Sequence, residues 1–227
     1  MNKRFVSLTF VLLMVPPSIW AEQSTMKVAT SLAPPYQELT NGQLTGSLVT
    51  LAQCALTGTQ SDYRLDLLPP RRALHAIALN QIDMVFSLSD SLDYSNLGIA
   101  SAPMLLEKWY WFSSKHHTID SKSNIAVVAG TGEEEWLRKQ FYSNIVAIKD
   151  LEAGFKMLKQ KRVDVVLTDL SKANAIADKA PLLLKGFDKT FARFSTQYAV
   201  FSHQFVNQNA HFLNTFNKAL LNCQPIG

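Results

Sequence analysis

The sequence predicts an α/β fold made of two similar lobes. One module occurs twice, over residues 74–87 and 155–169: a helix, a short turn, an Asp and an apolar strand ending near a hydroxyl residue. Each copy closes a β-α-β-α-β series, which is typical of a parallel sheet covered by helices. Two long segments, 104–113 and 190–202, are expected to connect the lobes as strands running out and back.

Prolines and turn signals delimit the elements of the first lobe. Pro34 and Pro35 end the first strand, because proline removes a backbone donor and fixes φ. Pro70 suits the first turn of a helix, where a missing N–H costs little. We expect strands at 26–30, 63–68 and 83–88, helices beginning at 45–47 and spanning 71–79, a turn at 41–42, and an irregular connection at 89–102.

The second lobe repeats the series after a polar loop at 115–124. We expect strands at 125–129, 144–148 and 163–169, and helices that begin near 133 and span 151–159 and 171–179. A terminal helix at 210–222 has an apolar face that should pack on a lobe; its members are Phe212, Leu213, Phe216, Ala219 and Leu220.

The N-terminus predicts an exported protein with a cleaved signal peptide over residues 1–21. Lys3 and Arg4 precede an apolar stretch that is too short to span a bilayer, and Ala21 is a small residue suited to cleavage. An uncleaved anchor is the alternative. Without Lys3 and Arg4 the formal charge falls from +4 to +2, and the scattered basic residues argue against nucleic-acid binding.

Cys54 and Cys223 are the two cysteines of the chain. Export would place them in an oxidising compartment, so we expect one disulfide bond. It would join the first helix to the last and close a very long loop. By lowering the entropy of the unfolded chain, such a bond would stabilise the fold by about 5 kcal/mol. The alternative is two separate buried thiols.

Several stretches resemble, in chain order, the motifs of one protein family. They are Pro34-Pro35-Tyr36, Asn80-Gln81-Ile82-Asp83, Gly130 to Leu137 (G-T-x-x-E-x-W-L) and Lys161 to Asp169. Together they resemble periplasmic solute-binding proteins of family 3, best known from amino-acid ABC transporters. The resemblance implies a type II periplasmic-binding-protein fold, with lobe 1 formed by 22–106 and 196–227 and lobe 2 by 107–195. It also implies a ligand in the cleft between the lobes.

One region departs from the family pattern. Amino-acid binders carry T-x-x-R after the first module strand, and its Arg clamps a carboxylate, but residues 89–96 contain no Arg. A bidentate guanidinium is hard to replace, so the departure disfavours an ordinary α-amino acid. Arg72 matches a [PW]-x-R-A-L element of one branch of the family. Arg71 and Arg72 would offer an anion contact from another direction.

Candidate ligand contacts in the first lobe follow the ends of its strands. Tyr36 is held by two prolines and is expected to form a pocket wall; the alternative is a surface aromatic. Ser87 and Ser89 would hydrogen-bond ligand, or else cap the backbone. Asp90 would pair with a ligand cation, or else act as a turn residue.

Candidates in the second lobe also lie at strand ends. Thr131 and Gly132 precede a helix whose free N–H groups favour a neutral or zwitterionic group, because three glutamates follow; a plain helix start is the alternative. Asp169 would contact a ligand ammonium or cap the next helix. Asp83 and Asp164 are expected to stabilise turns.

No enzyme motif is present: the chain lacks G-x-S-x-G, H-E-x-x-H and a P-loop. His116-His117 lies in a polar loop and does not suit a metal site, so we expect neither metal nor cofactor. We predict a monomeric periplasmic protein that binds a small polar molecule without catalysis and delivers it to an ABC permease. The alternatives are an accessory protein for a membrane sensor and, third, a dehydratase-like enzyme on the same fold.

Overall fold

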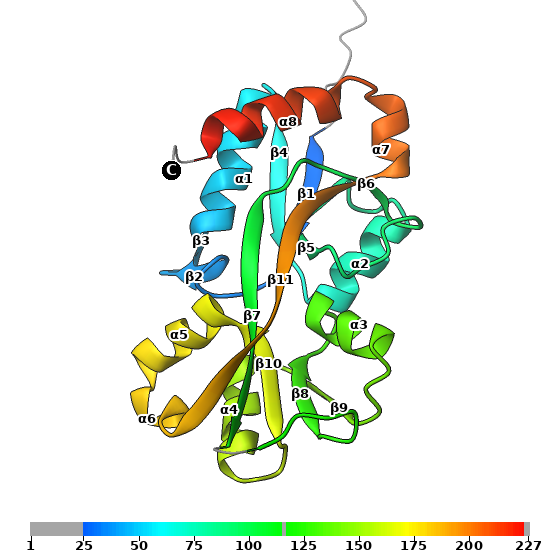
Figure 1. Ribbon diagram of the computed structural model, residues 1–227. Helices are drawn as coiled ribbons and strands as arrows, with labels where there is room; N and C mark the ends of the chain where they lie inside the picture. The colour runs from blue at the N-terminus through cyan, green and yellow to red at the C-terminus, as the bar shows by residue number, and fades with distance from the viewer. Residues whose placement is uncertain (1–24, 115–116, 225–227) are drawn as a thin grey trace, which may run out of the picture.

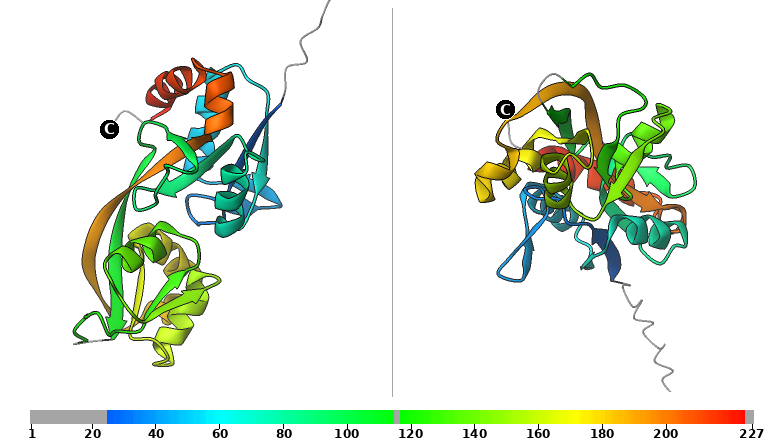
Figure 2. Two further views of the ribbon diagram at one scale, coloured as in Figure 1. Left: turned by 90° about the vertical axis from the view of Figure 1, so that its right-hand side faces the viewer. Right: turned by 90° about the horizontal axis from the view of Figure 1, so that it is seen from below.

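A computed structural model describes residues 25–114 and 117–224, so the predicted signal peptide, 1–21, and His116 lie outside the described residues. The chain forms two α/β lobes connected by two long strands, β7 (Leu105–Ser114) and β11 (Phe187–Ser202) (Figure 1). These strands run along one side of the molecule (Figure 2). The two-lobe fold predicted from the sequence is confirmed.

A single twisted sheet runs through both lobes. Its order is β4-β1-β5-β11-β7-β10-β8-β9, and β6 pairs with β11. Lobe 1 supplies the parallel strands β1 (Met26–Thr30), β4 (Tyr63–Leu67) and β5 (Met84–Ser89). Lobe 2 supplies β8 (Ile125–Val128), β9 (Ile145–Ile148) and β10 (Val165–Asp169), also parallel. The crossover strands pair with each other antiparallel from Phe187↔Ser114 to Gln197↔Leu105.

Helices cover the sheet in each lobe. Lobe 1 carries α1 (Ser47–Gly58), α2 (Pro70–Ala78), α7 (His203–Gln208) and α8 (Phe212–Cys223). Lobe 2 carries α3 (Gly132–Lys139), α4 (Leu151–Lys159), α5 (Leu170–Lys179) and α6 (Pro181–Leu184). The helices α6 and α7 were not predicted, since a helix of four to six residues carries too little periodicity to be recognised.

Two short strand features also differ from expectation. The turn at 41–42 closes a hairpin of β2 (Glu38–Thr40) and β3 (Gln43–Thr45), with positive φ at both Asn41 and Gly42 as two-residue hairpin turns require. The connection predicted to be irregular contains β6 (Gly98–Ala100). This strand forms because it pairs with β11, a tertiary contact that local sequence does not reveal.

The repeated module has the same turn in both lobes. Asn80 and Lys161 both adopt positive φ, at 54° and 57°, where the preceding helix ends. The Asp83 carboxylate accepts the Lys27 N–H at 2.8 Å, and the Asp164 carboxylate accepts the Asn124 N–H at 2.8 Å. Each Asp therefore ties its turn to the neighbouring parallel strand, which is the structural role predicted for both.

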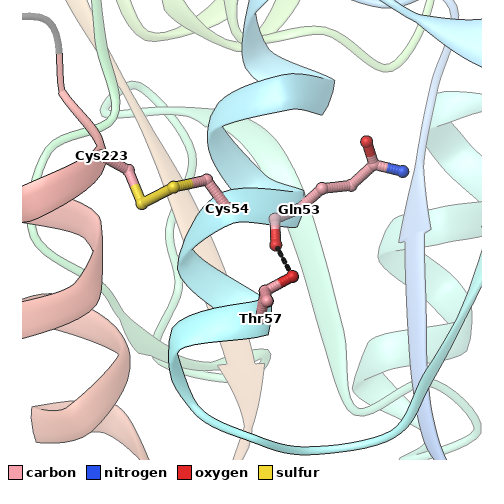
Figure 3. Close-up of a disulfide and its surroundings, with 4 residues drawn as sticks. All are labelled: Gln53, Cys54, Thr57 and Cys223. Carbon is pink, nitrogen blue, oxygen red and sulfur yellow. Dashed lines mark hydrogen bonds between the residues drawn. A yellow bond between two sulfur atoms is a disulfide. The ribbon is translucent and has the colours of Figure 1, made fainter.

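Each lobe has its own hydrophobic core on both faces of the sheet. In lobe 1, Phe86, Phe201 and Phe216 are fully buried among α1, α8 and the sheet. The predicted disulfide between Cys54 and Cys223 is confirmed and links α1 to α8, with Cα atoms 6.0 Å apart (Figure 3). The lobe boundaries at 106/107 and 195/196 stay a prediction, because both fall inside the continuous strands β7 and β11.

Candidate functional site

A small cavity lies at the junction of the lobes, beyond the carboxyl ends of their strands. Its volume is about 60 Å³. Open α/β sheets bind ligands at this position, because connecting loops and helix N-termini meet there. Lobe 1 contributes Ser31–Ala33, Pro70, Phe86–Ser89 and Leu92, lobe 2 contributes Val128, Gly130–Glu133 and Lys172, and Gln197 comes from β11.

Four predicted site residues line this cavity: Ser87, Ser89, Thr131 and Gly132. Ser89 is buried, and its hydroxyl lies 2.9 Å from that of Ser195 and accepts a backbone N–H at 3.1 Å. A Cβ at Gly132 would collide with the Cβ and Oγ atoms of Ser89, which lies across the lobe junction. The close approach of the lobes at this point therefore requires glycine.

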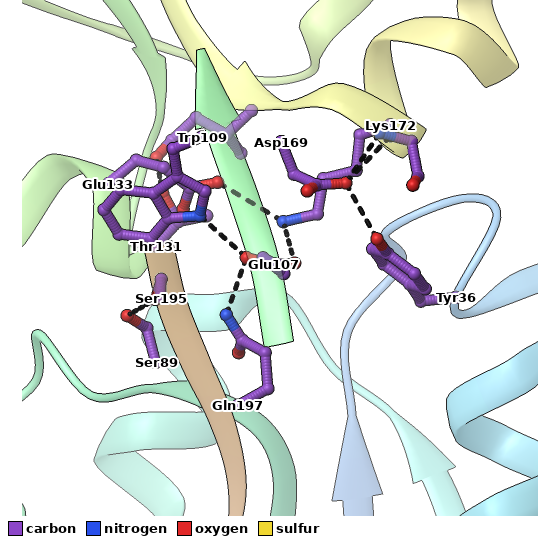
Figure 4. A network of polar contacts seen from close by, with 12 residues as sticks. Tyr36, Ser89, Glu107, Trp109, Thr131, Glu133, Asp169, Lys172, Ser195 and Gln197 are labelled. Carbon is purple, nitrogen blue, oxygen red and sulfur yellow. Dashed lines mark hydrogen bonds and ion pairs between the residues drawn. The ribbon is translucent and has the colours of Figure 1, made fainter. Parts of the chain in front are cut away.

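Tyr36 and Asp169 connect the two lobes but do not line the cavity. The Tyr36 hydroxyl donates to Asp169 Oδ1 at 2.8 Å (Figure 4). Asp169 also accepts the N–H groups of Ser171 at 2.8 Å, Lys172 at 3.2 Å and Lys108 at 2.9 Å, so it caps α5. Burial raises the pKa of Tyr36 well above its ordinary value, and the Asp169 carboxylate adds to the rise.

A buried charge cluster forms the second-lobe side of the cavity, and sequence reasoning missed it. Lys172 Nζ lies 2.8 Å from Glu107 Oε1 and 3.3 Å from Glu133 Oε1 (Figure 4). The other oxygen of Glu107 accepts the indole N–H of Trp109 at 2.8 Å and the amide of Gln197 at 2.7 Å. Glu107 inside the largely apolar segment 104–113 was the signal that could have revealed the cluster, because a buried carboxylate needs a partner.

The pKa values of this cluster reflect burial and mutual attraction. Burial raises the pKa of Glu107 above its ordinary value, although the Lys172 ammonium opposes the rise. Burial alone would lower the pKa of Lys172, but the carboxylates of Glu107 and Glu133 outweigh it and raise that pKa. Lys172 is therefore a firmly held ammonium at neutral pH.

Asp90 pairs with the protein's own guanidinium. Its Oδ2 lies 2.8 Å from Arg193 Nη2, and its Oδ1 accepts the Ser195 hydroxyl at 2.9 Å. The Arg193 guanidinium also lies over the rings of Trp109 and Trp136, at 5.3 and 5.9 Å from their centres. Asp90 lies next to the cavity wall but does not line it.

A second, more open cavity of about 240 Å³ lies beside the first. At its edge Arg71 of lobe 1 meets Glu134 of lobe 2 at 3.0 Å, and Glu134 also accepts Arg138 at 2.7 Å and the Gly130 N–H at 2.6 Å. Burial raises the pKa of Glu134, but these donors outweigh it and lower that pKa below its ordinary value. Arg72 is exposed and lines neither cavity.

Within residues 25–114 and 117–224, no group of three or more His, Cys, Asp or Glu side chains is arranged to bind a metal ion. The helices in this part of the chain are all too short or too polar to cross a membrane.

Solved structures resemble this chain along most of its length, although no family model and no curated protein sequence matches it. The arginine-, lysine-, histidine-binding protein ArtJ from Geobacillus stearothermophilus has a TM-score of 0.70 and 19% identity over 87% of this chain and 89% of its own. An ancestral arginine-binding protein bound to glutamine has a TM-score of 0.68 and 19% identity over 88% and 92%.

A histidine kinase sensor domain with similarity to periplasmic binding proteins is also similar, with a TM-score of 0.73 and 15% identity over 88% of this chain and 90% of its own. Identities this low establish the fold alone. The chain therefore has the two-lobe, type II periplasmic-binding-protein fold.

Proposed function

We propose that this protein belongs to the periplasmic solute-binding proteins of family 3 and captures a small polar ligand between its lobes, without catalysis. The observation that carries the proposal is the cavity at the strand ends, which both lobes line with hydroxyl and backbone groups and lobe 2 also with charged side chains. The ordered family motifs support it, and so does the likeness to amino-acid-binding structures.

The contacts between the lobes support binding by closure. Tyr36 of lobe 1 donates to Asp169 of lobe 2, and Arg71 of lobe 1 pairs with Glu134 of lobe 2. Both contacts flank the cavity, and in the described part of the chain the strands β7 and β11 connect the lobes. A ligand that contacts both lobes would stabilise the arrangement in which they touch, by hinge motion about those strands.

Delivery to an ABC permease after export to the periplasm is the transport form of this proposal. A second form, in which the protein reports ligand to a membrane signalling receptor, is favoured by the likeness to a histidine kinase sensor domain. Deleting the gene would distinguish them. Loss of ligand uptake with intact signalling supports transport, and loss of a ligand-dependent transcriptional response with intact uptake supports sensing.

A thermal-shift screen over polar metabolites tests ligand binding directly. A true ligand should raise the unfolding temperature in proportion to the logarithm of its concentration. Calorimetry with the same ligand should then show a single site. If no polar metabolite stabilises the mature protein, or if the ligand binds equally well to a Gly132→Trp variant, whose side chain would obstruct the cavity and hold the lobes apart, the proposed site is wrong. NMR spectra of the ligand after prolonged incubation would reveal any turnover.

A further inference from the structure

The charges around the cavity differ between its two sides. The residues that lobe 1 and Gln197 contribute to the wall carry no charged side chain, whereas lobe 2 contributes Glu133 and Lys172. Lys172 is already held by Glu107 at 2.8 Å and by Glu133 at 3.3 Å. The cluster therefore contains two carboxyl groups for one ammonium, and the one that lines the cavity is that of Glu133.

Glu133 is short of hydrogen-bond partners. It is 4% exposed, and among the residues that the structure describes its Oε1 meets Lys172, while its Oε2 accepts no hydrogen bond from protein and is not fully enclosed, so that a donor in the cavity can reach it. A buried carboxylate with one long ionic contact is costly unless a further donor reaches it. A donor that carries positive charge would satisfy both the open oxygen and the unbalanced charge.

The other carboxylates near the cavity have their partners within the protein. Asp169 accepts four donors, from Tyr36, Lys108 and the first turn of α5. Glu134 faces Arg71 and Arg138 in the neighbouring cavity. A ligand carboxylate, in contrast, would face Glu133 and would find Lys172 already paired with two carboxylates.

We infer that the cavity binds a small organic cation without a carboxylate group, an amine or a guanidinium, with its charge at Glu133 and its apolar part against Phe86, Leu88 and Leu92 of lobe 1. This inference rests on the proposed function and names the class of ligand that the same site takes. It separates this protein from a binder of intact amino acids, because the first lobe offers a neutral wall instead of a carboxylate clamp.

Calorimetry on the mature protein with matched compounds tests the ligand class. The probes are cadaverine, lysine and 1,5-pentanediol, and, as a second set, agmatine and arginine. We expect the two amines to bind, their carboxylate-bearing parents to bind more weakly by roughly tenfold or more, and the uncharged diol not to bind. Raising the salt concentration should weaken amine binding only slightly, because the contact is buried.

Two isosteric variants in the same helical turn test the position of the charge. Glu133→Gln should weaken binding of the stronger amine by roughly thirtyfold or more, since it leaves the cation without its buried partner. Glu135→Gln is the matched control: Glu135 is 38% exposed and lies 3.8 Å from Lys139, so its variant should bind within about twofold of wild type. Thermal unfolding without ligand establishes that both variants are folded.

Three results would overturn the inference. They are binding of lysine or arginine as tight as that of the amines, unchanged amine binding by folded Glu133→Gln, and no binding of either amine by wild-type protein. The first two leave the proposed function intact, because a ligand still binds. In the third case, the metabolite screen decides separately whether the cavity binds any ligand.

Discussion

The two lobes share one turn but end their central strands in different ways. Asp83 and Asp164 make equivalent hydrogen bonds to the neighbouring strand. In lobe 1, β5 ends at Ser89, and the next residue, Asp90, pairs with Arg193 near the surface. In lobe 2, β10 ends at Asp169, whose carboxylate caps the helix α5 that carries the largely buried Lys172.

This difference separates the repeated helix–turn–strand module, which is alike in the two lobes, from the strand ends at the cavity, which are not. The turn is retained in both lobes because each lobe needs its helix tied to its sheet. The strand ends are free to diverge, because they face the other lobe and not their own core. One wall of the cavity is consequently neutral and the other charged, and we propose that this asymmetry selects the ligand.

The largest effect is expected from Lys172→Met, which leaves Glu107 without its ammonium partner. Breaking a buried ion pair should lower the free energy of unfolding by about 3–5 kcal/mol, measured by urea denaturation. Lys179→Met on the same helix is the control; its side chain is 71% exposed, so the loss should stay below about 0.5 kcal/mol. Equal losses of unfolding free energy in the two variants would contradict a stabilising ion pair between Lys172 and Glu107 in lobe 2.

The ion pair at the strand end of lobe 1, between Asp90 and Arg193 of β11, should matter less. Arg193→Met removes an ion pair whose side chains are 29% and 30% exposed, and two contacts to tryptophan rings. We expect a loss of about 1–2 kcal/mol in the same urea experiment. A loss as large as that of Lys172→Met would remove the contrast between the lobes.

Gly132→Ala should push the lobes apart at the contact between Gly132 and Ser89. The new Cβ meets Ser89 near its backbone, so side-chain rotation cannot relieve the overlap. Overpacking should disfavour the arrangement with touching lobes by about 1–3 kcal/mol. Small-angle X-ray scattering should show a larger radius of gyration. The double variant Ser89→Gly/Gly132→Ala should restore the wild-type scattering curve, and failure to do so would mean that the overlap is not the cause.

Tyr36→Phe tests the hydrogen bond that connects the lobes. Asp169 keeps its three backbone donors, so the cost should be about 1 kcal/mol in free energy of unfolding. Tyr142→Phe is a suitable control, because the Tyr142 hydroxyl makes no hydrogen bond within residues 25–114 and 117–224. If both variants unfold at the same urea concentration, the Tyr36–Asp169 contact does not contribute to stability.

The smallest effect concerns pH and Glu134. Its pKa is below the ordinary 4.5, so its stabilisation is complete above that pH and is lost as the pH falls through the lower pKa of the folded state. The difference in unfolding free energy between wild type and Glu134→Gln should be less than about 1 kcal/mol, because Arg71 and Arg138 are more than half exposed. The difference should shrink on acidification; a constant difference would contradict the ion pair.

Part of the candidate site was predictable, because some signals are local. A hydroxyl or glycine at the end of a strand can be recognised from its neighbours, and Ser87, Ser89, Thr131 and Gly132 do line the cavity. The partners of Asp90 and Asp169 were not predictable. Arg193 and Tyr36 lie more than a hundred residues away in sequence and reach these carboxylates only when the lobes meet.

The sequence by itself determined the two α/β lobes, their connecting strands and the turns at Asp83 and Asp164, because hydrophobic periodicity and turn chemistry act over a few neighbouring residues. It also identified the cysteine pair, since two cysteines allow one bond. Only the tertiary structure decided how charge is distributed in the cavity. Glu107, Glu133 and Lys172 come from three separate elements. The energy of a buried charge depends on the partners that folding brings within a few ångströms of it.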